Sequence, residues 1–257
     1  MIKKIPVEHI KDLLFELTKK ELKVRYKNSY LGYLWSLLNP LALSLVFYLA
    51  FKVIMKVAIE NYTLFIIAGL FPWQLFSNSV NASATCFIGN ASLIKKTTFP
   101  KEMLVYGLIS SELIHFLLSI PVIVFFLIIY GKYPTPAWLL GLPLIITAQF
   151  LMAAGFSLAV ASANLFFRDL ERLVGIFTTL LFYLTPIIYS MDIIPKEYHR
   201  LIMMNPLSPL ILTYKGIFLE GVFDFRYFIY TFVWGVIVFF TGRAVYGKLN
   251  GQLAEAL

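Results

Sequence analysis

Long windows without any charged side chain recur along this chain. From Asn61 to Ile94, and again from Tyr133 to Phe167, there is no Asp, Glu, Lys or Arg. The hydrocarbon core of a bilayer is crossed by about 20 apolar residues in a helix, whose backbone polar groups all bond within the segment. These windows therefore predict an all-α integral membrane protein in which lipid is the solvent for the apolar surface.

The composition argues against a soluble fold. Hydrophobic residues make up 60% of the 257 residues and charged residues only 14%, and the mean hydropathy is +0.79. Soluble domains carry about 25% charged residues, and a chain of this length cannot bury so much apolar surface in its own core. The whole chain, residues 1–257, is interpreted as a single transmembrane domain.

Six helices are predicted to cross the membrane. They lie near residues 33–54, 63–88, 103–130, 138–165, 172–190 and 226–246. Between the last two, Leu201–Tyr214 is apolar but too short to cross, and Pro206 and Pro209 interrupt it. A short re-entrant helical segment is therefore predicted near 199–220, because irregular backbone survives at membrane depth only when it packs on protein or lines a wet cavity.

Residues 1–30 are predicted to form a cytoplasmic interface element. Apolar side chains in it recur at helical spacing, namely Val7, Ile10, Leu13, Leu14, Leu17 and Leu22. Lysines and acidic side chains occupy the other face, and Pro6 stands where a first-turn proline is tolerated. This pattern predicts an amphipathic helix on the inner membrane surface, with its lysines facing anionic headgroups. The alternative is an ordinary helix packed against the rest of the protein.

The basic residues indicate a topology rather than nucleic-acid binding. The net charge is +8, but most of the 22 Lys and Arg fall between apolar spans instead of clustering on one solvated face. If the N-terminus is cytoplasmic, the cytoplasmic segments hold most of these residues, in agreement with the positive-inside rule. Both termini are therefore predicted to be cytoplasmic, and no nucleic-acid partner is expected.

Catalytic and metal-binding motifs are missing from the sequence. No Gly-x-x-x-x-Gly-Lys-Ser/Thr stretch exists to cradle a nucleotide phosphate, and His9, His115 and His199 are far apart. We expect no catalytic residue, no metal and no cofactor in this chain, and therefore no enzyme; any energy that it uses is expected to come from elsewhere. The single cysteine, Cys86, excludes an intramolecular disulfide and is expected to be buried and inert.

Four local patterns cover nearly the whole chain. They are Arg25–Trp35 followed by Asn39-Pro40-Leu41, Lys95–Glu102 around Pro100, Phe167–Arg172, and Thr185–Tyr189 together with Asn205–Pro209. In this order they resemble the permease subunits of polysaccharide-exporting ABC transporters. Exporters of O-antigen are the most similar subgroup, with capsule and teichoic-acid exporters as neighbours.

The resemblance implies a homodimer joined to two copies of a separate subunit that binds ATP and Mg²⁺. It implies a long glycan on a polyprenyl diphosphate lipid as substrate, and the bacterial inner membrane as location. One alternative is the same architecture exporting a drug or small lipid. Alternatives of other classes are a passive channel, an ion-coupled carrier and a membrane glycosyltransferase.

Two groups of site residues follow from these patterns. Arg25, Tyr26, Lys27 and Ser29 are the candidate gate for the diphosphate headgroup, because they are basic and polar and join the interface helix to the first span. The candidate coupling loop to the ATPase consists of Lys95, Lys96, Thr97, Thr98, Phe99, Pro100, Lys101 and Glu102. Phe99 is the expected apolar anchor of this loop. Alternatively, the Arg25–Lys27 region is an anchor belt and the loop lysines only fix topology.

Aromatic and charged residues supply further candidates. Those near the channel-forming first and fifth spans of the family are Tyr33, Trp35, Tyr48, Phe177, Tyr183 and Tyr189. Their rings suit the C–H faces of sugars, although interface belts and lipid contacts are the alternative. At the predicted cytoplasmic turn, Arg168, Asp169, Glu171 and Arg172 are expected to form internal ion pairs, with Arg172 as a second candidate for the headgroup. Glu112 and His115 share one helix face and are expected to form a structural pair facing the protein interior.

Overall fold

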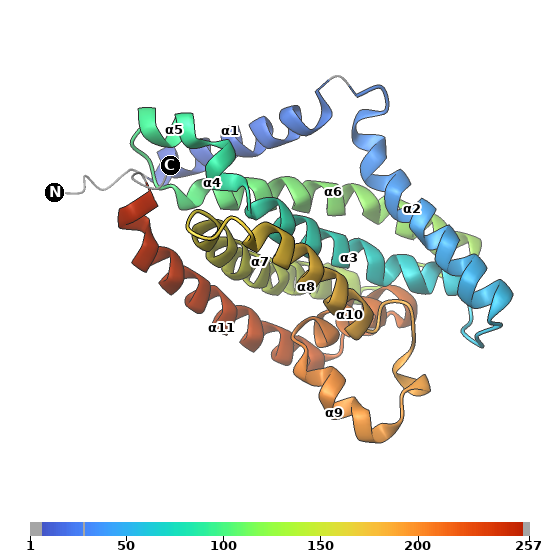
Figure 1. The fold of residues 1–257 in the computed structure, drawn as a ribbon. Coiled ribbons are helices and arrows are strands. Elements are labelled where there is room, and N and C mark those ends of the chain that lie inside the picture. The colour runs from blue at the N-terminus through green and yellow to red at the C-terminus, as the bar shows by residue number, and fades with distance from the viewer. Residues whose placement is uncertain (1–6, 28, 254–257) are drawn as a thin grey trace.

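The computed structural model describes residues 7–27 and 29–253, and all regular elements in these ranges are helical. Pro6 and Asn28, which belong to the predicted interface element, lie outside the described residues. The N-terminal end of α1 and the C-terminal end of α11 lie at the same end of the bundle (Figure 1). We call this the terminal end. The short helices α4 and α5 lie there as well, whereas α9 lies at the opposite end (Figure 1).

The helices have the following bounds. They are α1 Val7–Tyr26, η1 Gly32–Leu34, α2 Trp35–Phe47, η2 Tyr48–Ile54, α3 Tyr62–Ser83, α4 Cys86–Gly89, α5 Ala91–Lys96, α6 Glu102–Ile129, α7 Ala137–Asn164, α8 Leu170–Leu184, η3 Met191–Ile193, α9 Lys196–Met204, α10 Leu207–Lys215, η4 Gly216–Glu220, α11 Phe225–Leu249 and η5 Asn250–Gln252. The predicted spans near 103–130 and 138–165 agree with α6 and α7 to within one residue. The predicted span near 63–88 ends earlier, since α3 stops at Ser83 and the chain turns before α4.

Five helices in the described ranges are long and apolar enough to cross a membrane. They are Gly32–Ile54, Tyr62–Ser83, Glu102–Ile129, Ala137–Asn164 and Phe225–Gln252. The predicted fifth span near 172–190 corresponds to α8, which has only 15 residues and is about 22 Å long, less than the roughly 30 Å of the hydrocarbon core. It ends because Pro186 moves Thr185 into an extended conformation.

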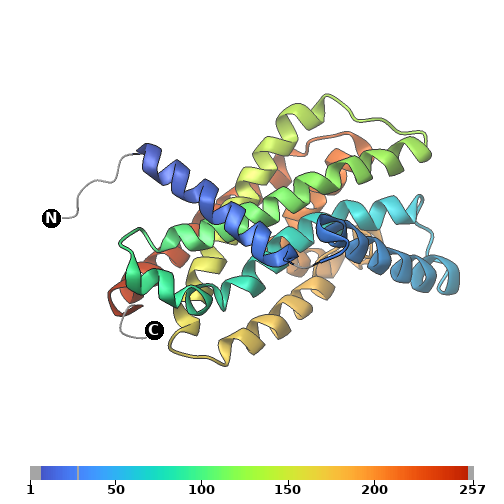
Figure 2. The same cartoon turned by 90° about the horizontal axis from the view of Figure 1, so that it is seen from above.

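The core consists of α3 and the elements packed around it. Within the apolar window of α3, 72% of the residues are buried inside the chain, against 11% in the window that contains α2. The view in Figure 2, at right angles to Figure 1, shows α2 and α8 at the periphery. Cys86 is buried and free, as expected.

Glycines allow the helices to approach closely. A Cβ atom on Gly155 of α7 would collide with the backbone of Val238 on α11, and one on Gly242 with the backbone of Gly155. Small residues at such crossings let helix backbones pack directly on each other within a membrane. The pairing of α7 with α11 therefore depends on residues that carry no side chain.

Helix α1 packs lengthwise on α6. Leu17 and Thr18 are buried, and a Cβ atom on Gly107 of α6 would lie 2.9 Å from Cβ of Leu17. The apolar face predicted for a membrane surface is thus turned towards protein, which is the alternative given above. Phe15 and Val24, by contrast, are exposed. A membrane contact for the exposed face stays a prediction.

Candidate functional site

An ion pair joins the end of α1 to the middle of α6. Nη1 of Arg25 donates to Oε1 of Glu112. The Glu112 side chain is only 4% exposed, whereas that of Arg25 is 38% exposed. Nδ2 of Asn78 on α3 donates to Oε2 of Glu112 at 3.2 Å. Both oxygens of the buried carboxylate are thus bonded, as a buried charge requires.

His115 lies about one helical turn beyond Glu112 and contacts the same end of α1. The Tyr26 hydroxyl is 3.3 Å from Nε2 and 3.4 Å from Nδ1 of His115. The Tyr33 ring centroid is 4.6 Å from that of Tyr26 and 6.1 Å from that of His115. Glu112 and His115 therefore face protein, as predicted. Each contacts α1, and within the part of the chain that the structure describes no hydrogen bond or ion pair joins the two.

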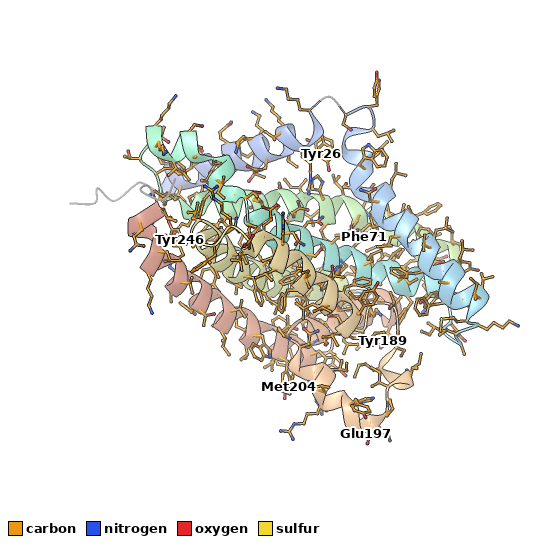
Figure 3. The ribbon with its side chains drawn as sticks, viewed as in Figure 1. Tyr26, Phe71, Tyr189, Glu197, Met204 and Tyr246 are labelled. Carbon is orange, nitrogen blue, oxygen red and sulfur yellow. The ribbon has the colours of Figure 1, made fainter. Side chains whose placement is uncertain are left out.

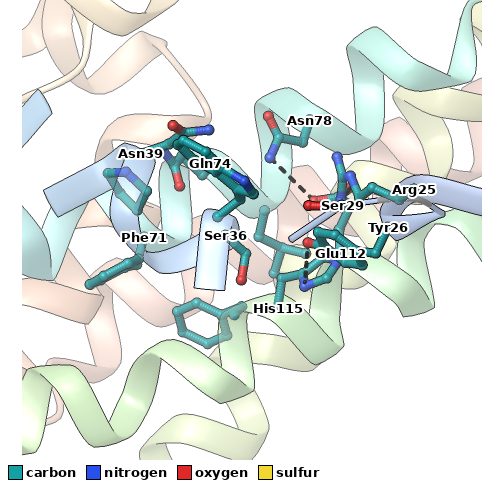
Figure 4. A pocket seen from close by; sticks show the side chains of 14 residues that line it. Arg25, Tyr26, Ser29, Ser36, Asn39, Phe71, Gln74, Asn78, Glu112 and His115 are labelled. Carbon is teal, nitrogen blue, oxygen red and sulfur yellow. Dashed lines mark hydrogen bonds and ion pairs between the residues drawn. The ribbon is translucent and has the colours of Figure 1, made fainter. Parts of the chain in front are cut away.

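A polar cavity of about 320 Å³ opens beside these groups. Figure 4 shows side chains from α1, α2, α3 and α6 converging on it. It is lined by Arg25, Tyr26, Ser29, Trp35, Ser36, Asn39, Pro40, Phe71, Gln74, Leu75, Asn78, Glu112, His115 and Phe116. A cavity with a half-exposed guanidinium, hydroxyls and amides can bind an anionic group and orient it through hydrogen bonds.

The electrostatics of the cavity keep the Tyr26 hydroxyl neutral. Burial raises the pKa of Tyr26 above its ordinary value, and the positive charge of Arg25 opposes this shift only in part. The phenol can therefore both donate and accept a hydrogen bond near neutral pH. Among the residues that the structure describes, Arg25 and Glu112 are the ones that bring fixed charges to this cavity.

A second cavity, of about 420 Å³, lies between α3 and α8. It is lined by Leu43, Phe47, Leu70, Trp73, Gln74, Ser77, Asn78, Asn81, Gly175, Thr178, Thr179, Phe182 and Tyr183. Gln74 and Asn78 line both cavities. The two spaces therefore meet at one face of α3.

The structure brings most of the predicted headgroup residues together. Arg25, Tyr26 and Ser29 line the first cavity, and Oγ of Ser29 accepts from the backbone N–H of Gly32 at 3.1 Å. Lys27 is exposed and does not line it. The chain between α1 and α2 thus holds a polar turn at the mouth of the cavity.

The predicted coupling loop is exposed only in part. The side chains that are exposed are those of Lys95, Lys96, Thr97 and Thr98, while those of Phe99, Pro100, Lys101 and Glu102 are half-buried. Phe99 packs against the core, so its ring already has contacts within the chain. Glu102 lies 3.9 Å from the guanidinium of Arg243 on α11. These contacts reduce the apolar surface that Phe99 can offer to a partner.

The six predicted channel aromatics do not form one cluster. Tyr33 and Trp35 lie near the first cavity and Tyr183 lines the second, but Phe177 is exposed on α8 and Tyr48 is half-buried at the start of η2. The Tyr189 hydroxyl donates to the backbone oxygen of Tyr183 at 3.1 Å. Figure 3 shows Tyr26 and Tyr189 in different parts of the structure. Their shared role in a channel stays a prediction.

The turn before α8 is not stabilised by the ion pairs that the sequence predicted. Among the residues that the structure describes, no ion pair joins Arg168, Asp169, Glu171 and Arg172, which are all exposed. Ion pairs between exposed side chains contribute little to stability, so the turn does not require them. Instead, Oδ1 of the buried Asn164 accepts from the backbone N–H of Glu171 at 3.0 Å, and its Nδ2 donates to the Ala84 oxygen at 2.8 Å.

Sequence reasoning missed the amides that complete the site. Gln74 and Asn78 stand four residues apart in a charge-free window, which places them on one helix face. This spacing, in a segment predicted to cross the membrane, could have identified the two amides as candidate site residues. Within the described ranges no group of three or more His, Cys, Asp and Glu side chains is placed to hold a metal ion.

A family model described as ABC-2 type transporter matches residues 12–219, from α1 through η4. The chain belongs to the ABC-2 type transporter family. It is therefore a multi-pass membrane protein, and the first cavity, including its contacts between α1, α3 and α6, lies within the matched region.

Individual relatives span almost the same length. An O-antigen export system permease protein of Klebsiella pneumoniae is 45% identical over 246 residues, covering 96% of this chain and 95% of the relative. One of Myxococcus xanthus is 36% identical over 211 residues, covering 81% and 80%. A polysialic acid transport protein of Escherichia coli is 23% identical over 233 residues, covering 88% and 89%.

Proposed function

We propose that this chain is the transmembrane subunit of an ATP-driven exporter that moves polyprenyl-diphosphate-linked polysaccharide of the O-antigen type out of the cytoplasm. The observation that carries this proposal is the 45% identity, over 96% of the chain, to a protein named as an O-antigen export permease. The polar cavity beside Arg25 supports it, since a membrane protein that handles only apolar cargo has no need of a buried ion pair and free amides at this depth.

The position of the cavity fits a lipid headgroup. Helix α6 has 28 residues and is about 42 Å long, so it exceeds the hydrocarbon core by roughly 12 Å. Glu112 lies 10 residues beyond Glu102, the first residue of α6, about 15 Å along the helix. The Arg25–Glu112 pair is therefore close to a membrane interface, where a diphosphate resides, if the terminal end projects from the bilayer.

Arg25 is the residue we assign to the diphosphate. One terminal nitrogen of its guanidinium bonds Glu112, which orients the planar group and leaves other N–H donors for a phosphate in the forked geometry that Arg favours. Lys27 is exposed nearby and adds positive charge. The Ser29 and Tyr26 hydroxyls supply neutral hydrogen bonds at the mouth of the cavity.

The energy for transport comes from a partner in this proposal. The sequence contains no Walker A motif, and the ABC-2 family implies association with ATP-binding cassette subunits. We propose a homodimer with two such subunits, which bind ATP and Mg²⁺. The exposed side chains of Lys95, Lys96, Thr97 and Thr98 at the terminal end form the coupling surface, and half-buried Phe99 supports it from within.

We further propose six crossings, with both termini in the cytoplasm of a bacterium and the chain in its inner membrane. Helix α8 and the residues after it would make the fifth crossing in chain order, in addition to the five long helices. The segment α9–α10–η4 would be the re-entrant element, because α10 is almost entirely buried by the rest of the chain. The basic residues of α5 and of the α1 surface support a cytoplasmic location for the terminal end.

The decisive experiment is to purify the chain together with its proposed ATP-binding cassette subunit and to measure ATP hydrolysis with and without lipid-linked glycan. We expect a stable complex whose rate changes with the glycolipid, and loss of that response in Arg25→Gln. A stable complex indifferent to glycan would favour a drug or small lipid as substrate. The absence of any complex would favour a channel or an ion-coupled carrier.

A further inference from the structure

Between Phe71 and Asn81, the residues of α3 that its neighbours leave partly uncovered are all polar. From Phe71 to Asn81 every residue is buried except Gln74, Ser77, Asn78 and Asn81. A helix that faces lipid shows the reverse pattern, because an amide or hydroxyl in hydrocarbon without a partner costs several kcal/mol. The uncovered face of α3 is therefore built for water or for a polar ligand.

This face is continuous. Residues 74, 77, 78 and 81 follow the spacing of one helix face, and we call it the amide strip. On the side of α6 it adjoins the cavity of about 320 Å³ that holds Arg25. On the side of α8 it adjoins the cavity of about 420 Å³, where Thr178 and Thr179 face it.

Part of the hydrogen-bonding capacity of the strip is used within the protein. Nδ2 of Asn78 donates to Glu112, and Nδ2 of Asn81 donates to the backbone oxygen of Ser77 at 2.7 Å and to Oγ1 of Thr178 at 3.2 Å. These bonds fix the two asparagines in place. The strip is thus pre-organised by α6 and α8 rather than mobile.

The remaining capacity points into the cavities. Among the described residues, the Gln74 side chain makes no hydrogen bond, and the Oδ1 atom of Asn78 accepts none. Figure 4 shows Asn78 turned towards Glu112, and Gln74 of the same helix among the side chains that line the cavity. A free amide offers N–H donors and a carbonyl acceptor side by side, which matches the paired donor and acceptor of a hydroxyl group.

The chemistry of the second cavity selects a neutral, hydroxyl-rich ligand. None of its lining residues carries a charge, so it lacks the charged partner that would favour a phosphate or a metal ion. Trp73, Phe182 and Tyr183 line it beside the amides, with the Trp73 and Phe182 rings edge to face at 5.6 Å. Aromatic faces next to amides suit a sugar, which has apolar C–H faces and polar hydroxyls.

From this geometry we propose that the amide strip is a hydroxyl-binding subsite for neutral sugar residues, with Gln74 as its free contact. The assignment rests on the proposed function, and places sugars beside the headgroup cavity of Arg25. The sugars come either from the first residues attached to the lipid or from later residues of a passing chain. Both present the same hydroxyls to the strip.

The first test is cysteine accessibility in the complete complex with its ATPase, in a Cys86→Ala background. Gln74→Cys and Ser77→Cys are expected to react with a membrane-impermeant thiosulfonate, with or without ATP. Ile237→Cys, at a position of α11 that is 47% exposed and apolar, is the control and is expected to stay unreactive. A strip that is unreactive in both nucleotide states would overturn the proposal, since it would then face lipid or protein.

Protection identifies the ligand. We expect maltohexaose, a neutral oligosaccharide probe, to slow the labelling of Gln74→Cys at millimolar concentration, and glycolipid with a single sugar to do so only if the strip binds the first residue. Inorganic phosphate is expected to give no protection of Ser77→Cys, because Ser77 lines only the uncharged second cavity. Labelling that neither sugar probe slows would overturn the hydroxyl-binding assignment.

The second test is export by Gln74→Leu, with Gln252→Leu as the matched control at an exposed amide at the far end of the chain. Loss of one hydrogen bond predicts a roughly three- to tenfold lower export rate, with normal assembly, and Gln74→Asn should recover part of it. Unchanged export by Gln74→Leu would overturn the inference alone. A wild-type complex indifferent to glycan would overturn the proposed function and the sugar assignment together, while accessibility still decides whether the strip is wet.

Discussion

Two basic side chains meet the helical core, and their surroundings differ. Arg25 is half-exposed, bonds the carboxylate of Glu112 and faces a cavity. Lys215 at the end of α10 is 5% exposed. Its Nζ donates to the backbone oxygens of Pro186 at 2.6 Å and Ile187 at 2.9 Å, and lies 3.3 Å from the centroid of the Phe65 ring.

The difference separates a binding group from a structural one. Arg25 has an open side and a counter-ion, so a ligand can share or replace its partner. Lys215 has no acidic partner among the described residues, and its amino group is enclosed by carbonyl oxygens and an aromatic face. It ties α10 to the residues that follow α8. The two basic side chains therefore have different roles because only one of the two sites is open.

The largest effect is expected from placing an acidic side chain at the enclosed position of Lys215. Lys215→Glu places a carboxylate, which only accepts hydrogen bonds, against two carbonyl oxygens and the face of Phe65. We expect loss of folded protein, measured as monodisperse yield in detergent and thermal unfolding. Lys196→Glu, at an exposed position of α9, is the control. Wild-type stability of Lys215→Glu would show that the contacts of Lys215 do not hold α10 in place.

Breaking the ion pair between Arg25 and Glu112 should reduce stability by a smaller amount. Arg25→Met leaves the buried Glu112 carboxylate with Asn78 as its remaining partner, and we expect a loss of about 1–3 kcal/mol in unfolding free energy and loss of the glycan response of the ATPase. Adding Glu112→Gln removes the unpaired charge. The double variant should regain stability without regaining the glycan response, which would separate folding from binding at this site. Recovery of both would argue against a headgroup role for Arg25.

A smaller effect is expected at Gly69, whose missing side chain leaves space for Lys215. A Cβ atom on Gly69 of α3 would lie 3.1 Å from Cε of Lys215 and 3.3 Å from Cγ2 of Ile211. Gly69→Ala therefore crowds the lysine, which offsets the helix propensity gained, and we expect a net loss below about 1 kcal/mol. Gly247→Ala on α11, where a Cβ atom meets open space, should instead stabilise by roughly 0.5–1 kcal/mol. Thermal unfolding of both variants in parallel measures the contrast.

The smallest effect concerns Tyr26. Its pKa is raised by burial, so the stability that it contributes is complete below the pKa of an unfolded tyrosine, about 10, and is lost as the pH rises through the higher folded value. Tyr26→Phe should lower stability by less than about 1 kcal/mol at neutral pH, and its melting temperature should fall less steeply than that of the wild type above pH about 10. Tyr133→Phe, at an exposed ring, controls for the loss of a hydroxyl. Parallel curves for wild type and Tyr26→Phe would contradict this.

Much of the fold was predictable because its causes are local. The ends of α6, α7 and α11 lie within a few residues of prediction, since a charge-free apolar window both requires and limits a membrane helix. Helix α8 was harder, because its apolar window continues past the point where Pro186 ends the helix. The direction of the apolar face of α1 was ambiguous, since lipid and a neighbouring helix attract the same residues.

The candidate site was predictable only in pieces. The basic end of α1 and the intramembrane pair of Glu112 and His115 each stood out, because ionisable groups near hydrocarbon are costly. The sequence did not reveal that Arg25 pairs with Glu112, since the two residues are 87 positions apart along the chain. The predicted ion pairs around Arg168 were wrong, because exposed charges gain little from pairing and the buried Asn164 holds the turn instead.

The sequence by itself determined the solvent, the helical class and most of the span positions, because each depends on the transfer of a continuous segment into lipid. Only the tertiary structure decided that Glu112 is the partner of Arg25, that Lys215 is enclosed by Pro186 and Ile187, and that the partly uncovered residues in the middle of α3 are polar. Which side chains meet depends on how helices pack, and packing between helices in a membrane is set by close contacts of residues distant in sequence.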